Sequence, residues 1–286
     1  MAELKKEHEI ISKWHSNNGE PLISICCLCY NHELYIEDAL QGFLSQDTDF
    51  AFEILIHDDA STDRSSDIIR AYEDRYPRII KAVYQNENQY SKGVQVSVTF
   101  NFSRAQGQFI AMCEGDDYWT DKDKLQIQVD TMINRPELSG CFHMVKFQTF
   151  NTFSGFYYQI PPKDIVSTRD IILQHYIPTA SVVYRKKMLM SVIRETPQLS
   201  DFPVGDIPLS ILMSKKGKII FINKVMGVYR KNPTSLTHDQ KHLDKSRKRM
   251  MNMYARLLSS VEFKDYIFVL YRILRLLLGY IKWRKS

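Results

Sequence analysis

Three carboxylates gather in the segment Glu114-Gly115-Asp116-Asp117-Tyr118-Trp119, directly after an apolar run at 109–113 that predicts a buried β-strand. A second acidic turn, at 58–63, also follows an apolar strand, at 52–57. In open α/β sheets, ligands bind beyond the carboxyl ends of the strands, where these two turns would meet. Closely spaced acidic oxygens suit Mg²⁺ or Mn²⁺, and Mg²⁺ usually binds through one or two carboxylates together with substrate phosphates. The pattern therefore predicts a divalent metal site, in preference to an acidic turn that merely caps a helix.

A metal-bound diphosphate would need further groups to grip the nucleoside and to deprotonate an attacking hydroxyl. Asp58 or Asp59 can accept a hydrogen bond from a base edge or a ribose, and Tyr30, after the first strand, offers an aromatic face. Asp206 stands alone in an otherwise apolar turn at 203–208. A lone Asp before a helix is often only an N-cap, and composition alone favours that role for Asp206.

Apolar strands alternate with helical periodicity up to about residue 135, which predicts βα units on a largely parallel sheet. We expect strands at 22–29, 52–57, 79–84 and 108–113, and helices at 33–45, from Ser61 or Thr62 to before Pro77, at about 94–106, and from Asp121 or Asp123 to Pro136. The composition changes after residue 140, which predicts a second lobe packed on the first. That lobe should hold β-prone stretches at 141–150 and 155–160, helices near 168–175, 186–195 and up to about 215, and a strand at 218–230.

The composition is typical of a globular protein, because 286 residues with 44% hydrophobic and 25% charged content can bury one large core or two smaller ones. The five cysteines, at 26, 27, 29, 113 and 141, lack the spacing of a zinc site and are predicted to be buried reduced thiols. The polar N-terminus, residues 1–20, contains no apolar segment, which predicts neither a signal peptide nor a membrane anchor. The chain is therefore expected to begin in the cytosol.

The net charge of +5 hides an uneven split, since residues 241–286 hold 12 Lys and Arg against 3 acids and the rest of the chain sums to −4. A DNA-binding body would spread positive charge over its folded face, so no nucleic-acid partner is expected. A helix over 266–283 would carry Arg272 and Arg275 at its centre, which does not fit a membrane-spanning segment. Two arrangements remain open: residues 262–286 lie on an anionic membrane surface, or the helix docks on the protein's own second lobe.

Three motifs in order resemble an inverting family 2 glycosyltransferase of the bacterial cell-surface polysaccharide type. They are Pro21-Leu22-Ile23-Ser24-Ile25 through Tyr30-Asn31, then Phe52-Glu53-Ile54-Leu55-Ile56 with Asp58-Asp59-Ala60-Ser61-Thr62-Asp63, and then Gly107-Gln108-Phe109-Ile110-Ala111 with 114–119. The match is strong over 20–135 and looser over 136–230. It implies an α/β chain of GT-A nucleotide-diphospho-sugar transferase fold, with a mainly parallel central sheet, flanking helices and a C-terminal helical extension.

The resemblance implies a nucleotide-sugar donor, with a UDP-sugar as the first expectation, and Mn²⁺ or Mg²⁺ as the cofactor. It places the metal at Asp116, and the donor sugar or the residues that support it at Asp117 and Trp119. The residues that it assigns to the donor nucleotide are Cys29, Tyr30, Asn31, Asp58, Asp59, Asn86, Glu114 and Gly115. Gly205-Asp206 falls where the family has its catalytic base, which favours Asp206 as the base over the N-cap role. Its carboxylate would deprotonate the acceptor hydroxyl during in-line attack at the anomeric carbon, with inversion of configuration.

The sequence departs from the family pattern at three places. Glu114 stands where the family's Asp-x-Asp motif begins, so its contact with the metal is open. The segment 97–101 replaces the usual Ala-Arg-Asn, so an Arg contact to the diphosphate must come from elsewhere, and Arg104 and Arg230 are the candidates. His238 lies in a stretch, 229–238, that resembles the loop folding over the donor, and it is a third candidate phosphate contact.

The implied organisation is a polar lead-in at 1–20, a donor-binding half at 21–135, an acceptor-binding half at 136–238 and a basic amphipathic helical tail at 239–286. The expected function is metal-dependent inverting transfer of a sugar to a saccharide or lipid-linked saccharide, in the cytoplasm or peripherally on the inner face of the cell membrane, with a homo-oligomer left open. A metal-dependent phosphohydrolase, which would need further ligands for two ions, and a nucleotide-binding module without turnover are the alternatives. A nicotinamide-dependent dehydrogenase is excluded because no Gly-x-Gly-x-x-Gly follows the first strand.

Overall fold

The computed structural model describes residues 4–15, 19–149, 152–156, 161, 163–174, 177–197, 199, 205–231, 240–259 and 261–284. The elements along these residues are α1 Glu7–Ile11, β1 Ile23–Cys29, α2 Ile36–Leu44, β2 Phe52–Asp58, α3 Ser65–Arg75, β3 Ile80–Tyr84, η2 Tyr90–Lys92, η3 Ser97–Phe102, β4 Phe109–Met112, β5 Tyr118–Trp119, α4 Lys124–Ile133, β6 Leu138–Thr149, β7 Thr152–Phe156, β8 Ile165–Val166, α5 Thr168–Leu173, η4 Thr179–Ser181, β9 Val183–Arg185, α6 Lys186–Glu195, α7 Asp206–Lys216, β10 Lys218–Lys231, α8 Gln240–Leu257 and α9 Phe263–Arg284.

One sheet runs through both halves of the chain, with the strands in the order β3-β2-β1-β4-β9-β6-β10-β5. The first four strands are parallel, as predicted. Beyond them the sheet is mixed, because β9 runs antiparallel to both β4 and β6, whereas β10 is parallel to β6. The residues after 136 therefore extend the first half's sheet instead of forming a lobe that packs on it.

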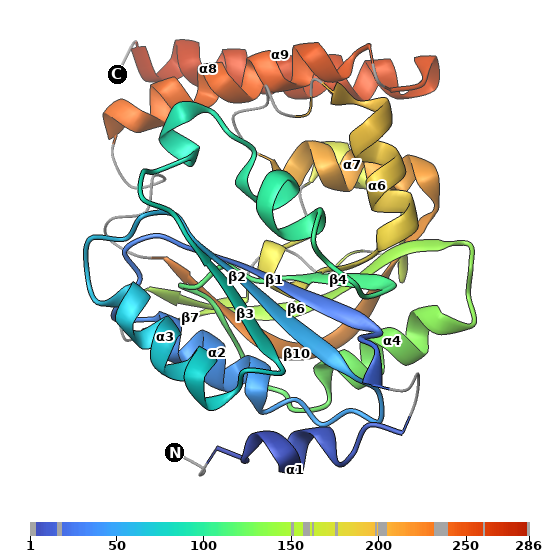
Figure 1. Cartoon of the computed structure of the whole chain (residues 1–286). Coiled ribbons are helices and arrows are strands. Elements are labelled where there is room, and N and C mark those ends of the chain that lie inside the picture. Colours follow the sequence, from blue (N-terminus) through green and yellow to red (C-terminus); the bar gives the residue numbers. More distant parts are fainter. Residues whose placement is uncertain are drawn as a thin grey trace.

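Helices cover both faces of this sheet (Figure 1). On one face α2, α3 and α4 enclose a core that includes Cys27, and on the other face α5, α6 and α7 enclose a core that includes Cys26, with α8 and α9 outside them. Adjacent residues of β1 thus point to opposite faces, as strand alternation requires. All five cysteines are free and buried, which agrees with the prediction of reduced thiols.

Two local predictions differ from the structure. The expected helix at 94–106 is a π-helix of six residues, Ser97–Phe102, and Asn101 within it donates from Nδ2 to the Cys27 carbonyl at 3.0 Å. The helix α3 begins at Ser65 with Arg64 at its cap, instead of at Ser61 or Thr62. The Ser61 hydroxyl instead accepts from Asn31 N at 2.9 Å and donates to Asp58 Oδ1 at 2.5 Å. In both cases a contact with another strand or turn overrides the local preference.

The C-terminal helix α9 docks on the body along one face and exposes the other. Val269 is fully buried, and Arg272 donates from Nη1 to the Leu173 carbonyl of α5 at 3.2 Å. The opposite face forms an apolar stripe, defined as Phe263, Ile267, Leu270, Tyr271, Leu274, Leu277 and Leu278, each at least 40% exposed.

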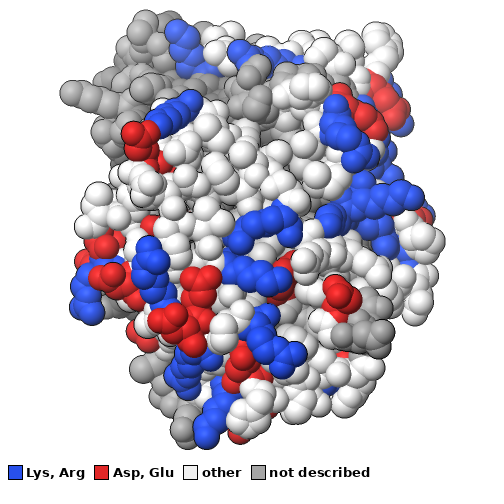
Figure 2. All heavy atoms as spheres, viewed as in Figure 1, with Lys and Arg blue, Asp and Glu red and all other residues white. Residues whose placement is uncertain are grey.

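None of the helices in the described part of the chain combines the length and the apolar character needed to cross a membrane. On the face seen in Figure 2, Lys and Arg side chains are interspersed with Asp and Glu.

Candidate active site

The turns after β1 and β2 are tied to each other at the carboxyl edge of the sheet. Cys29 and Asp58 are level in the β1–β2 register. Asn31, which has a left-handed φ of 56°, donates from its backbone N to Ser61 Oγ at 2.9 Å, and its Oδ1 accepts from Thr62 N at 2.8 Å. The two turns therefore meet, as the sequence predicts.

Asp58 and Asp59 both organise loops in this structure. Asp58 is buried and accepts from the hydroxyls of Ser61 and Ser66, the latter at 2.7 Å. Asp59 accepts from the backbone N of Gln89 at 2.7 Å and of Tyr90 at 3.0 Å, so it fixes the segment that carries η2. Asp59 Oδ1 also lies 3.3 Å from His57 Nε2, so a role for Asp59 at the nucleobase would use the second lone pair of Oδ2.

The other predicted nucleotide contacts differ in exposure. Tyr30 is 45% exposed and Asn86 is also exposed, so both can meet a ligand. Cys29 is buried, and desolvation raises the pKa of its thiol to about 12. Only its backbone lies at the strand end, where its carbonyl accepts from Asp59 N at 2.9 Å.

The acidic loop, residues 114–119, is held close to the end of β1 by a glycine. Gly115 N donates to the Leu28 carbonyl at 2.8 Å. A Cβ at this position would lie 2.9 Å from Ile36 Cδ1 and 3.0 Å from His32 Nδ1, inside normal contact distance. The close approach of the acidic loop to β1 and α2 therefore favours a residue without a side chain at position 115.

The three carboxylates of the acidic loop repel one another. Glu114 retains solvent access, yet desolvation by the surrounding protein, followed by the charges of Asp116 and Asp206, raises its pKa to about 8. Asp117 is buried, and desolvation and then Asp116 raise its pKa well above the usual range. One of its oxygens accepts from Arg230 N at 2.8 Å, and the other is buried without a partner. A cation beside Asp116 would relieve this repulsion.

The donor set fits a metal that completes its coordination with a substrate. Within the described ranges, no group of three His, Cys, Asp or Glu is arranged to hold a metal unaided. Mg²⁺ usually keeps several waters and binds through one or two carboxylates and substrate phosphates. Half-buried Asp116, with Glu114 beside it, supplies that kind of partial site.

Trp119 lies behind the acidic loop, in the core. Its Nε1 donates to the Ala180 carbonyl at 2.8 Å, its ring lies 4.7 Å from that of Phe43, and the side chain is 3% exposed. Trp119 therefore packs behind the acidic loop, which matches the supporting position that the sequence allowed for it beside a contact with the donor sugar.

The two predicted arginines are already engaged. Arg104 donates to the carbonyls of Ile56, Lys81 and Phe100 at 2.8–3.0 Å, which commits it to the backbone and contradicts its assignment as a phosphate contact. Arg230 reaches the acidic loop, where its Nη1 donates to the Asp116 carbonyl at 3.4 Å, and it pairs with Asp38. His238 lies outside the described residues.

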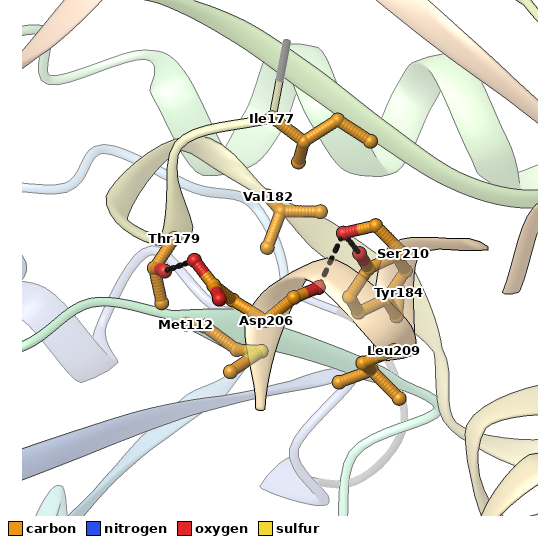
Figure 3. Close-up of a pocket in the computed structure, with 8 residues that line it drawn as sticks. All are labelled: Met112, Ile177, Thr179, Val182, Tyr184, Asp206, Leu209 and Ser210. Atoms are coloured by element: carbon orange, nitrogen blue, oxygen red, sulfur yellow. Dashed lines mark hydrogen bonds between the residues drawn. The ribbon is translucent and has the colours of Figure 1, made fainter. Parts of the chain in front are cut away.

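Asp206 is the first residue of α7, and Gly205 occupies the N-cap position. Figure 3 shows its carboxylate directed at Thr179, whose Oγ1 donates to Oδ2 at 3.4 Å. Ser210 donates to the Asp206 carbonyl at 2.8 Å and receives a bond from the Tyr184 hydroxyl, which fixes the start of the helix. The adjacent pocket, about 10 Å³, has room for about one water molecule. Met112, which ends β4 two residues before Glu114, lines this pocket together with Asp206, so the candidate base lies near the start of the acidic loop.

Sequence reasoning missed Asp38 and Thr179, which contact Arg230 and Asp206 respectively. Each lies in a segment far along the chain from its partner. No local spacing could have identified either residue.

A family model described as glycosyl transferase family 2 matches residues 24–191. An uncharacterized protein of Mycobacterium bovis is 34% identical over 225 residues, which cover 76% of this chain and 60% of that relative. TuaG of Bacillus subtilis, named as a teichuronic acid biosynthesis glycosyltransferase, is 39% identical over 118 residues, covering 41% of this chain and 44% of TuaG. This chain thus spans about 60% of the length of the mycobacterial relative.

Solved structures share the fold at low sequence identity. TarS 1–349 of S. aureus in complex with UDP-GlcNAc superposes with a TM-score of 0.66 at 18% identity, covering 89% of this chain and 72% of TarS 1–349. The mannosyltransferase PcManGT from Pyrobaculum calidifontis, in complex with GDP-Man and Mn²⁺, gives a TM-score of 0.63 at 13% identity, covering 96% and 79%. The architecture is therefore that of GT-A glycosyltransferases.

Proposed function

Because the chain belongs to glycosyl transferase family 2, we propose that it transfers a sugar from a nucleoside-diphosphate donor to a hydroxyl of a saccharide or lipid-linked saccharide, with inversion and with a divalent metal. The observation that carries this proposal is the shared pocket lined by Asp206 and by Met112, the last residue of β4, from which the chain enters the acidic loop. The carboxylates of the acidic loop and that of Asp206, which are far apart in the sequence, thus have two different roles at one site. The loop holds the donor phosphates, and Asp206 receives the acceptor's proton.

The donor site would be built from the strand ends. Asp116 would bind Mn²⁺ or Mg²⁺ with help from Glu114, while the exposed Tyr30 and Asn86 would contact the nucleoside. The metal, when bound, neutralises charge on the leaving diphosphate. PcManGT with GDP-Man and Mn²⁺, and TarS with UDP-GlcNAc, support a nucleotide-sugar donor of this kind. A UDP-sugar is our first choice.

The transfer step needs one proton acceptor. The acceptor oxygen forms a bond to the anomeric carbon as the bond from that carbon to the diphosphate oxygen breaks, and the hydroxyl proton passes to Asp206. Thr179 and the Ile207 backbone N donate to the two oxygens of Asp206, at 3.4 and 2.8 Å, and so orient its carboxylate. Attack from the face opposite the leaving group inverts the anomeric configuration.

The experiment is a panel of nucleotide sugars incubated with Mn²⁺, Mg²⁺ or chelator, with release of free nucleotide as the signal. The wild type is compared with Asp116→Ala, Asp206→Asn and, as a control, Asp130→Asn on the exposed face of α4. We expect one donor to be cleaved in a metal-dependent reaction that requires Asp116 and slows with Asp206→Asn. Binding without release would favour a nucleotide-binding module, and metal-dependent cleavage of simple phosphate esters would favour a phosphohydrolase.

We also propose that α9 places the enzyme on an anionic membrane surface, at the inner face of the cell membrane. The apolar stripe is flanked by exposed Lys264 and Arg275, and the segment 241–286 is strongly basic, so the helix offers both signals that interfacial binding requires. A lipid-linked saccharide would be presented at such a surface. TuaG, named for teichuronic acid biosynthesis, supports a polysaccharide setting.

Flotation with vesicles rich in anionic phospholipid tests the membrane proposal. The wild type should float, and a Leu270→Glu, Leu274→Glu double variant and a chain ending at Glu262 should not. Ala255→Glu, on the exposed part of α8, should float like the wild type. Equal flotation of the wild type and the double variant would remove the idea. A dimer in sedimentation that the double variant abolishes would assign the stripe to a second copy of the chain instead.

A further inference from the structure

Arg230, near the end of β10, lies under the acidic loop and is only 10% exposed. Its Nη2 forms an ion pair with Asp38 Oδ2 on α2, and its guanidinium lies 4.2 Å over the ring of Tyr118. Its Nη1 donates to the Asp116 carbonyl at 3.4 Å. One side chain therefore joins α2, β10 and the backbone of the residue proposed to hold the metal.

The backbone of Arg230 makes a second link to the same loop. Its N–H donates to Asp117 Oδ1 at 2.8 Å, and two residues earlier Val228 pairs with Tyr118 across β10 and β5. The acidic loop is thus bound to β10 by strand pairing, by a carboxylate and by a guanidinium. Such a loop has little freedom along the β10 direction.

The helix α2 supports the loop from the opposite side. Gly42 approaches the Trp119 backbone so closely that a Cβ there would lie 2.9 Å from its N and its O, and Ile36 borders Gly115. Asp38, on the same helix, is 44% exposed and anchors the guanidinium at its outer end. The Asp38–Arg230 pair therefore ties α2 to β10 across the acidic loop.

We propose that Asp38 and Arg230 are positioning residues that preform the metal and diphosphate site by clamping the acidic loop between α2 and β10. This inference rests on the proposed function. It assigns Arg230 to the loop instead of to the phosphates, because its guanidinium is already paired and covered by Tyr118. Residues that orient metal ligands typically change metal affinity 10–100-fold when replaced.

The two roles of Arg230 predict opposite results for Asp38→Asn. If Arg230 were a phosphate ligand, freeing it from Asp38 would leave nucleotide binding equal or tighter. If the pair is a clamp, Asp38→Asn weakens only the part of the affinity that depends on metal. The measurement is calorimetric titration of UDP and of GDP with Mn²⁺ and with chelator, on the wild type, Asp38→Asn and Arg230→Gln. The control is Glu195→Gln, which removes an ion pair with Lys216 between α6 and α7.

We expect the ratio of metal-free to metal-bound Kd to fall about tenfold in Asp38→Asn and Arg230→Gln, with the metal-free Kd unchanged. The control should keep the wild-type ratio. The clamp would be overturned if Asp38→Asn kept the wild-type ratio of metal-free to metal-bound Kd, or if Arg230→Gln raised the metal-free Kd. Thermal unfolding of each variant separates a global loss of fold from this local effect.

Amide hydrogen exchange of the ligand-free protein tests the clamp without knowledge of the donor. Amides of the acidic loop should exchange faster in Asp38→Asn than in the wild type, while those of β1 stay the same. Unchanged exchange in the acidic loop would refute the clamp. If the wild type binds neither nucleotide but Asp38→Asn still loosens the loop, a donor linked to UDP or GDP is refuted and the clamp stands.

Discussion

Replacement of Arg104 by Met removes a bridge between three backbone segments. Arg104 donates to the carbonyls of Ile56 in β2, Lys81 in β3 and Phe100 in η3, and to Asn101 Oδ1 at 3.1 Å. Methionine retains much of the apolar stem but has no donor. The three carbonyls would then have to find water or remain unpaired in a partly buried position.

The expected cost follows from the bonds lost. At about 1 kcal/mol for each of the three carbonyl bonds, the folded state loses about 3 kcal/mol. For a chain of this size, about 2–3 °C per kcal/mol gives a fall in Tm of roughly 6–9 °C. The assay is thermal unfolding followed by circular dichroism, with nucleotide binding measured on the same sample below the transition. Binding of nucleotide by the remaining folded protein should be unchanged.

The control is Arg135→Met. Arg135 makes an ion pair with Glu137 at 3.3 Å, and both side chains are more than 40% exposed, so Arg135→Met should leave Tm close to that of the wild type. If Arg104→Met keeps the wild-type Tm and instead weakens nucleotide binding, Arg104 is a phosphate contact and the structural reasoning is wrong. Arg104→Lys should fall between the two, because one ammonium cannot reach all three carbonyls.

Two further changes test the site and the core behind it. Gly115→Ala places a Cβ 2.9 Å from Ile36 Cδ1 and should shift the acidic loop enough to lower turnover about 10–100-fold in the nucleotide-release assay. Wild-type turnover in Gly115→Ala would contradict the tight approach. Burial lowers the pKa of Lys124 to about 7 from 10.5, so the unfolded chain binds its proton more readily and stability should rise between pH 7 and about 10. Lys124→Met should flatten this rise in Tm, and an identical pH slope in both proteins would show that Lys124 is not desolvated as described.

Local patterns were sufficient for the strands and for the acidic segments after them. Apolar runs that alternate with segments of helical periodicity predict β1 to β4. The ligand-binding edge follows from the general rule that ligands bind beyond the carboxyl ends of the parallel strands. The motifs also carried the resemblance that family membership confirms. The helix expected at 94–106 is shorter and of the π type, Ser97–Phe102; Asn101 bonds to β1 and Arg104 bonds across two strands, and neither contact is visible in sequence spacing.

The sequence by itself determined the order of the first strands and helices, the place of the acidic loop and the burial of the cysteines, because these depend on burial patterns within a few residues. Only the tertiary structure decided what each polar side chain does. It buries Trp119 against Ala180, commits Arg104 to carbonyls, and sets Arg230 against Asp38. Each of these pairs joins segments that are distant in the chain, so the direction of the side chain and the acceptors it meets arise from packing, which periodicity does not encode.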